Sequence, residues 1–153
     1  MKILKYALFL MAFALPVYAS EAEELKCIAD NIYFEAGNQS VKGMIAVTNV
    51  VQNRIKDPRW PDTHCGVIKQ GYKKGRRDCQ FSWYCDGKSD EIPNNRISQE
   101  IYLLAQHIAI IALDRELPDF TNGAVNYHAD WVNPWWAKGL TRTTKIGVHI
   151  FYK

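Results

Sequence analysis

The sequence lacks a strong excess of charge of either sign. Its 153 residues include 19 basic and 16 acidic side chains, which give a formal net charge of +3. Lys2 and Lys5 lie within the first 19 residues, so the rest of the chain is close to neutral. Binding to nucleic acid needs a strongly cationic face. The composition therefore argues against nucleic acid as a partner.

Internal repeats and low-complexity tracts are also absent. The chain is 48% apolar and 23% charged, close to an ordinary globular protein, which excludes a disordered polypeptide. Its length suits one domain.

An apolar run long enough for a stable membrane span is missing as well. The shorter run within residues 1–19 follows two lysines and ends in Val17, Tyr18 and Ala19. A basic start, an apolar middle and a small-x-small end are typical of a secretory signal. We expect a signal peptide over residues 1–19 and an exported domain over residues 20–153, with membrane contact only through the signal during export. A signal that stays uncleaved and tethers the domain is the alternative.

Cysteine pairs with the Cys-x-x-Cys spacing of structural zinc sites do not occur. The cysteines are Cys27, Cys65, Cys79 and Cys85. An even number in a small exported domain predicts two disulfides, with three possible pairings. The alternatives are a zinc site that includes His64, or a nucleophilic cysteine with His64, His107, His128 or His149 as its base. We expect no metal and no cofactor.

Helical periodicity dominates the first two thirds of the chain. Apolar stripes predict helices over residues 24–36, from the N-cap Ser40 to residue 55, and from Ser98 to the residues before Leu117. Gly43 is expected to mark close packing of the second helix against the first. Residues 57–96 show no sustained period and hold three of the four cysteines.

The last third of the chain changes character. Residues 123–128 and 145–152 are β-like segments, joined by an aromatic-rich connection. Helices first and strands last predict an α+β fold, with a small antiparallel β region toward the C-terminus and disulfide staples.

Glu35 is the first candidate for a catalytic group. A helix places it beside the buried stripe that includes Ile32, and Tyr33 and Phe34 precede it in the sequence. A carboxyl held against apolar groups loses hydration of its charged form, so its pKa rises. Such an acid stays protonated near neutral pH and can donate to a glycosidic oxygen. A solvated carboxylate at the end of a helix is the alternative.

Polar and aromatic side chains elsewhere are candidates for sugar binding. Asn49 and Asn53 lie four residues apart on the second helix, where they either bind a sugar, orient Glu35 or face solvent. Aromatic faces stack on pyranose rings, and five tryptophans are many for so small a domain, although core packing is the default for any one of them. The remaining candidates are Gln80, Ser82, Tyr127, His128, Trp135 and Trp136.

A second carboxylate facing Glu35 is not evident. Glycosidases that work by the usual routes need one as nucleophile or base. Asp86 and Asp130 are the candidates, and Asp86-Gly87 is also typical of a simple turn. Without a second acid, a hydroxyl of the substrate can attack instead. That reaction is lytic transglycosylation, in which one residue serves as acid and then as base.

Ordered motifs along the chain resemble a known family. They are Ile32-Tyr-Phe-Glu-Ala-Gly37, Gly43-Met-Ile-Ala-Val47, Val50-Val-Gln-Asn-Arg54, Cys65-Gly-Val-Ile68, Cys79-Gln-Phe-Ser-Trp83, Cys85-Asp-Gly87, Tyr127-His-Ala-Asp130, Pro134-Trp-Trp-Ala137 and Ile146-Gly-Val-His-Ile-Phe-Tyr152. Together they resemble the SleB-type cell-wall hydrolases, the spore-cortex-lytic family, in its cysteine-bearing Gram-negative and phage branch.

The resemblance implies a lysozyme-like α+β fold that acts on peptidoglycan, with Glu35 as general acid. It implies lytic transglycosylation between N-acetylmuramic acid and N-acetylglucosamine, with simple muramidase- or glucosaminidase-type hydrolysis as a second possible reaction. A glycan-binding module without catalysis competes with this interpretation, as does a thiol or zinc hydrolase. The expected location is the periplasm or cell envelope, and an unidentified regulator that restrains a self-lytic enzyme is a candidate partner besides peptidoglycan.

Overall fold

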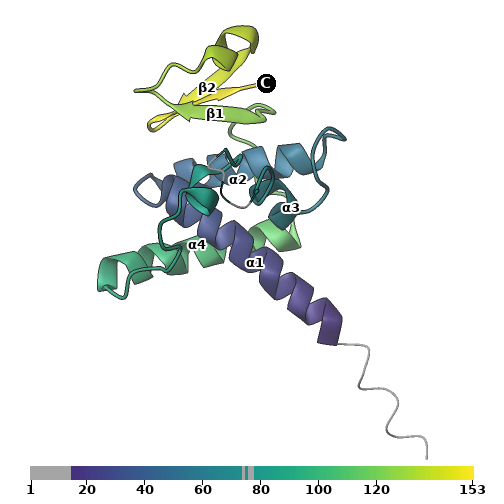
Figure 1. Cartoon of the computed structure of the whole chain (residues 1–153), viewed down its shortest axis with the longest axis vertical. Helices are drawn as coiled ribbons and strands as arrows, with labels where there is room; N and C mark the ends of the chain where they lie inside the picture. Colours follow the sequence, from purple (N-terminus) through teal and green to yellow (C-terminus); the bar gives the residue numbers. More distant parts are fainter. Residues whose placement is uncertain (1–14, 74, 76–77) are drawn as a thin grey trace, which may run out of the picture.

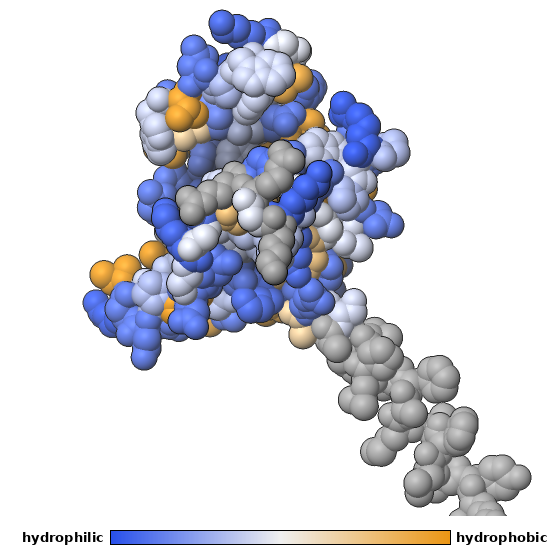
Figure 2. All heavy atoms as spheres, viewed as in Figure 1, coloured by the Kyte–Doolittle hydropathy of each residue, from blue (hydrophilic) through white to orange (hydrophobic). Residues whose placement is uncertain are grey.

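Helices form one part of the molecule, and a small sheet lies over α2 on the side away from α4 (Figure 1). The computed structural model describes residues 15–73, 75 and 78–153. In chain order the elements are α1 (Leu15–Ala36), α2 (Val41–Ile55), α3 (His64–Ile68), η1 (Ser82–Cys85), α4 (Arg96–Asp114), β1 (Asn126–Ala129), η2 (Trp135–Gly139), β2 (Arg142–Ile146) and β3 (His149–Tyr152). The face of the molecule seen in Figure 2 is mostly hydrophilic.

The predicted helical stripes form the main apolar core, where α1 crosses α4 and contacts α2 (Figure 1). Its buried side chains include Ile28, Ile32, Met44, Val47 and Ile108. Within the described residues, no helix is both long and apolar enough to cross a membrane. Residues 1–14 of the predicted signal lie outside the described part of the chain.

The start of α2 agrees with the prediction, whereas the starts of α1 and α4 differ from it. The side chain of Ser40 caps α2 and accepts a hydrogen bond from the backbone N–H of Gly43, as predicted. The first helix begins at Leu15 rather than at residue 24. The helix predicted to open at Ser98 begins at Arg96, because the side chain of Asn95 is the N-cap and accepts from the Ser98 N–H.

The long segment between α2 and α4 contains two short helices, α3 and η1, that periodicity did not predict. Disulfides hold this segment: Cys27–Cys65 joins α1 to α3, and Cys79–Cys85 closes the loop that contains η1. The expectation of two disulfides is confirmed. All four cysteines are paired, so the zinc-site and nucleophilic-cysteine hypotheses are wrong.

The sheet is antiparallel, with strand order β1-β3-β2. The β-like segment predicted over residues 145–152 is in fact the end of β2 and all of β3, separated by a turn at Gly147, whose φ is +56°. The sheet packs on α2 through Ile146 and Phe151, which contact Ala46 and Val50 in a second apolar cluster. Tyr127 of β1 reaches Glu35 in the last turn of α1, so the sheet and α1 meet there.

Gly43 does not mark close packing of α2 against α1, so that expectation is wrong. A Cβ atom at this position would lie 2.8 Å from the Cβ of Gln39 and 3.8 Å from the Oγ of Ser40. The glycine therefore leaves room for Gln39, whose Oε1 accepts a hydrogen bond from the backbone N–H of Val148 at 3.2 Å. Gln39 thus connects the α1–α2 loop to the β2–β3 turn.

Candidate active site

A pocket of about 720 Å³ lies where the end of α1 meets the η1 loop and the sheet. Five of the predicted site residues line it: Glu35, Gln80, Ser82, Tyr127 and His128. Trp135 and Trp136 line a neighbouring pocket of about 440 Å³ instead. Asn49 and Asn53 line neither pocket.

Glu35 is partly buried in the last turn of α1. The hydroxyl of Tyr127 donates a hydrogen bond to its Oε2 at 2.8 Å. Burial raises the pKa of the Glu35 carboxyl, while the Tyr127 hydrogen bond and the charge of Arg54 oppose that shift less strongly. The carboxyl therefore retains its proton to higher pH than a solvated glutamate, as the apolar sequence context predicted.

Tyr127 on β1 is the side chain that joins Glu35 to the rest of the fold. It packs against the helical core, the cluster around Cys27 and Cys65, and the cluster between α2 and the sheet. Burial is the main cause that raises the pKa of the Tyr127 hydroxyl well above its ordinary value, and the charge of the nearby Glu35 raises it further. The phenol therefore stays protonated and acts as a fixed donor to Glu35. The sequence singled out Tyr127 for sugar contact and gave no indication of this partnership.

Among the described residues, Glu35 is the one carboxyl-bearing side chain that lines either pocket. The carboxylate of Asp130 forms an ion pair with Lys145 at 2.6 Å. Asp86 accepts a hydrogen bond from the backbone N–H of Lys88, as in the simple turn that its sequence suggested. Neither of the two candidate second acids lines the pocket that contains Glu35.

Arg54 is a pocket residue that sequence reasoning missed, and it lines both pockets. Arg54 is only 4% exposed, and its Nε donates to the carbonyl oxygen of Val125 at 2.8 Å. The guanidinium lies 4.1 Å from the ring centre of Trp60. Burial lowers the pKa of Arg54 to about 10, so it remains charged at neutral pH. A signal was available, because Arg54 continues the buried helical stripe of Val47 and Val50, where a charge is unexpected.

His149 and Trp131 also line the pocket and were not singled out as sugar-binding residues. His149 is 6% exposed, and its ring lies 5.0 Å from that of Tyr127 in an edge-to-face arrangement. Burial lowers the pKa of His149, so the ring is neutral at neutral pH. Trp131 is 72% exposed and offers an aromatic face at the edge of the pocket.

His128 lines the pocket but uses both ring nitrogens within the fold. Its Nδ1 lies 2.8 Å from the carbonyl oxygen of Ala129, and its Nε2 lies 2.9 Å from the hydroxyl of Tyr152. These contacts hold the ring as part of the pocket wall.

Asn49 and Asn53 support a loop outside the pocket. The Oδ1 of Asn49 accepts from the backbone N–H of Phe120 at 3.1 Å, and the Nδ2 of Asn53 donates to the carbonyl oxygen of Ala124 at 3.0 Å. Both amides therefore hold the segment that leads into β1. We expected these amides to contact sugar, and the structure places them outside both pockets.

A family profile described as Cell Wall Hydrolase matches residues 38–152. The chain belongs to this family, and the resemblance that the motifs carried is confirmed. The matched region begins just after Glu35. The disulfides and the family together indicate an extracytoplasmic location.

Similar proteins include a spore cortex-lytic enzyme of Halalkalibacterium halodurans, 26% identical over 84% of this chain and 34% of the relative. The chain thus spans about a third of the length of that relative. Among solved structures, the catalytic domain of the Bacillus cereus SleB protein gives a TM-score of 0.59 at 24% identity, over 86% of this chain and 91% of the other. The catalytic domain of the germination-specific lytic transglycosylase SleB from Bacillus anthracis gives 0.58 at 25% identity, over 85% and 93%. The expected lysozyme-like α+β fold is confirmed by these structures.

Proposed function

We propose that this protein cleaves the glycan strands of peptidoglycan as a lytic transglycosylase, between N-acetylmuramic acid and N-acetylglucosamine. The observation that carries the proposal is Glu35, a carboxyl with a raised pKa that alone among the described acidic side chains lines the pocket. Membership of the cell wall hydrolase family and the likeness to a structure described as a lytic transglycosylase support the substrate and the reaction.

In the proposed reaction, protonated Glu35 donates its proton to the glycosidic oxygen, and the bond from that oxygen to C1 of the muramyl unit breaks. The oxygen of the muramyl 6-hydroxyl then bonds to C1. The Glu35 carboxylate takes the proton that this hydroxyl loses. The products are a new glycan end and an anhydro-muramyl end, and Glu35 is again protonated.

Tyr127 suits both steps of this reaction. Because its hydroxyl donates to Oε2 of Glu35, it fixes the carboxyl plane and leaves Oε1 to exchange the proton with the substrate. Hydrolysis by the usual routes would need a second carboxylate, about 5 Å away as nucleophile or about 6.5–9.5 Å away as base. The ion pair of Asp130 with Lys145 and the turn position of Asp86 favour attack by the substrate's own hydroxyl.

Sugar binding is assigned to polar and aromatic groups along the two pockets. Gln80 and Ser82 on the η1 loop supply an amide and a hydroxyl, and Trp131, Trp135 and Trp136 supply aromatic faces. We also propose that residues 1–19 act as a signal peptide and that the domain works in the periplasm or cell envelope.

Digestion of purified sacculi tests the proposal. Mass spectrometry of the released muropeptides distinguishes anhydro-muramyl ends, which are lighter by one water, from the reducing ends that hydrolysis leaves. We expect anhydro ends, and we expect Glu35→Gln to lower the rate by about a thousandfold, because its amide cannot supply the proton.

Asp130→Asn and Asp86→Asn are the matched controls, since each removes a carboxylate that lies outside the pocket and each should retain nearly full activity. Reducing ends among the products would show that the reaction is hydrolysis and not transglycosylation. Binding to sacculi without release of fragments would favour the non-catalytic glycan-binding module, and full activity in Glu35→Gln would exclude the mechanism.

A further inference from the structure

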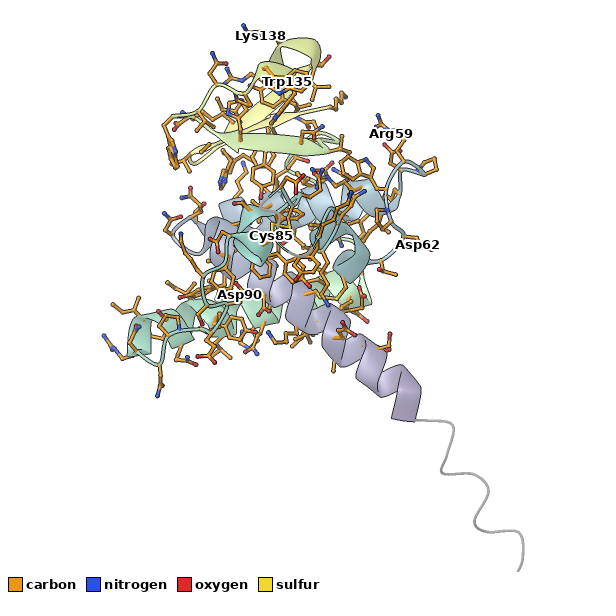
Figure 3. All side chains as sticks on the ribbon, in the orientation of Figure 1. Arg59, Asp62, Cys85, Asp90, Trp135 and Lys138 are labelled. Carbon is orange, nitrogen blue, oxygen red and sulfur yellow. A yellow bond between two sulfur atoms is a disulfide. The ribbon has the colours of Figure 1, made fainter. Side chains whose placement is uncertain are left out.

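The second pocket, of about 440 Å³, adjoins the Glu35 pocket and is not used by the proposed acid–base chemistry. Arg54, Gln80 and Tyr127 line both pockets and form the boundary between them. The other side of the second pocket comes from β1 and the connection between β1 and β2, where Trp135 is 85% exposed (Figure 3). A ligand bound beside Glu35 therefore lies next to the second pocket.

The lining of the second pocket is rich in hydrogen-bond donors and has one sign of charge. Among the described lining residues, Arg54 carries a positive charge and none carries a carboxylate. The amides of Gln80 and Asn126 and the indole N–H groups of Trp135 and Trp136 add uncharged donors. This set suits an anionic group attached to a partly apolar ligand.

Arg54 also has a hydrogen-bond donor that the described part of the fold leaves unpaired. Its Nη1 is buried and has no hydrogen-bond partner among the described residues. Trp60 at 4.1 Å and Phe81 at 5.4 Å flank the guanidinium, and the Nε bond to Val125 fixes its orientation. A buried donor without an acceptor is costly, and a carboxylate oxygen is the acceptor that an arginine pairs with most strongly.

We propose that the second pocket is an anion subsite for the lactyl arm of the muramyl unit whose bond Glu35 cleaves. The arm presents either its own carboxylate or that of the peptide attached to it, and Arg54 receives this carboxylate. N-acetylglucosamine has no such arm, so the subsite determines which of the two alternating sugars lies at the cleaved bond. The inference rests on the proposed function for its substrate, but the binding test of the subsite needs no turnover.

Binding of small sugars to the purified, disulfide-bonded protein tests the subsite without any turnover. The probes are N-acetylmuramic acid, its methyl ester, N-acetylglucosamine and N-acetylmuramyl-L-alanyl-D-isoglutamine, titrated while the indole N–H signals of Trp135 and Trp136 are followed by NMR. We expect N-acetylmuramic acid to bind about tenfold or more tightly than its ester and N-acetylglucosamine, because only the acid presents a charge to Arg54. If the muramyl dipeptide binds better still, the peptide carboxylate is the preferred occupant.

Variants assign this preference to Arg54. Arg54→Met should abolish the difference between acid and ester, and Arg54→Lys should retain part of it because it keeps the charge but loses the planar fork. Arg96→Met, which removes an exposed arginine at the start of α4, should leave binding unchanged. The comparison of acid with ester in the wild-type protein remains decisive even if Arg54→Met does not fold.

Equal binding of the acid and the ester to the wild-type protein would overturn the subsite and leave the proposed reaction intact. Full activity of Glu35→Gln would overturn the reaction and leave the subsite intact. The first result concerns binding to the wild-type protein and the second concerns turnover, so the two failures are distinguishable.

Discussion

At the scale of single residues, burial and a hydrogen bond act in opposite directions on the Glu35 carboxyl. Burial is the larger effect and raises its pKa, while the hydroxyl of Tyr127 and the charge of Arg54 stabilise the ionised form. A residue that must give up a proton and then take one back benefits from this balance. The position of Tyr127 is therefore as important to the proposed chemistry as the burial of Glu35.

The pH dependence of cleavage follows from this balance. Because only protonated Glu35 can start the reaction, the rate should fall as pH rises through its pKa. Tyr127→Phe removes a hydrogen bond that lowers this pKa, so the fall should move to higher pH, and the maximal rate should drop about tenfold because the carboxyl is less well oriented. Release of soluble fragments from labelled sacculi over a pH series measures both effects. Tyr72→Phe, which changes an exposed tyrosine outside both pockets, is the control, and a fall at the same pH in both variants would contradict the account.

Glu35→Gln should lower activity but should raise the stability of the folded protein at neutral pH. The folded-state pKa of Glu35 lies above its ordinary value of 4.5, so the folded protein holds this proton more tightly than the unfolded chain. The wild type therefore loses stability as pH rises from about 4.5 through the folded-state pKa, and Glu35→Gln does not. We predict that Glu35→Gln is the more stable protein at neutral pH and that its advantage disappears below the ordinary pKa. Urea unfolding at several pH values measures this, and parallel pH dependence in the two proteins would refute it.

At single positions, the sequence indicated the burial of Glu35 but did not indicate which side chains contact it. The raised pKa of Glu35 could be predicted because apolar residues are adjacent to it in the chain. Its contacts with Tyr127 and Arg54 depend on how the sheet docks on α2, which no spacing reveals. Asn49 and Asn53 were assigned to sugar because an amide in a helix offers the same donors whether it faces a ligand or a loop.

At the scale of elements, the connection between Gln39 and the β2–β3 turn holds the sheet in register with the helices. A Cβ atom at Gly147 would lie 2.3 Å from the Oε1 of Gln39, at a backbone φ of +56°. Gly123 has a similar φ of +79°, but a Cβ atom there has open space around it. Comparing substitutions at the two glycines therefore separates the effect of backbone strain from the effect of the contact with Gln39.

Gly147→Ala should lower the free energy of unfolding by more than the strain of about 1–2 kcal/mol expected for Gly123→Ala. The excess should disappear in the background of Gln39→Ala, where the clashing amide is absent. Urea unfolding of the two single glycine variants, Gln39→Ala and the Gln39→Ala/Gly147→Ala double variant gives the coupling. Equal losses for Gly147→Ala and Gly123→Ala would show that Gln39 does not determine the turn.

Elements with a long apolar period were predictable, and those fixed by cross-links or turns were not. The stripes of α1, α2 and α4 each extend over several turns, so their existence is set by local sequence. In contrast, α3 has five residues and η1 four, and the disulfides and surrounding packing hold them in place. The division between β2 and β3 was hidden because Ile146, Val148 and Ile150 continue an alternating pattern across the turn.

At the scale of the whole molecule, the two disulfides should have different functions. Cys27–Cys65 joins residues separated by 38 positions and ties α1 to α3, whereas Cys79–Cys85 joins residues separated by 6 positions and encloses Gln80 and Ser82. Loop-closure entropy predicts losses of about 4 kcal/mol for the first bond and about 2 kcal/mol for the second. We therefore expect Cys27→Ala/Cys65→Ala to lose more stability, and Cys79→Ala/Cys85→Ala to lose a larger share of its sacculus cleavage at a temperature where both remain folded. Thermal unfolding and the sacculus assay measure the two quantities, and the reverse order would refute this division.

The small Cys79–Cys85 ring also links the shape of the candidate site to the redox state of its surroundings. Thiols stay reduced in the cytoplasm, so this ring is expected to close only in an oxidising, extracytoplasmic compartment. Until then the pocket wall that carries Gln80 and Ser82 is not held in shape. Under the proposed function, oxidation of Cys79 and Cys85 would therefore delay cleavage until the chain has reached an oxidising compartment.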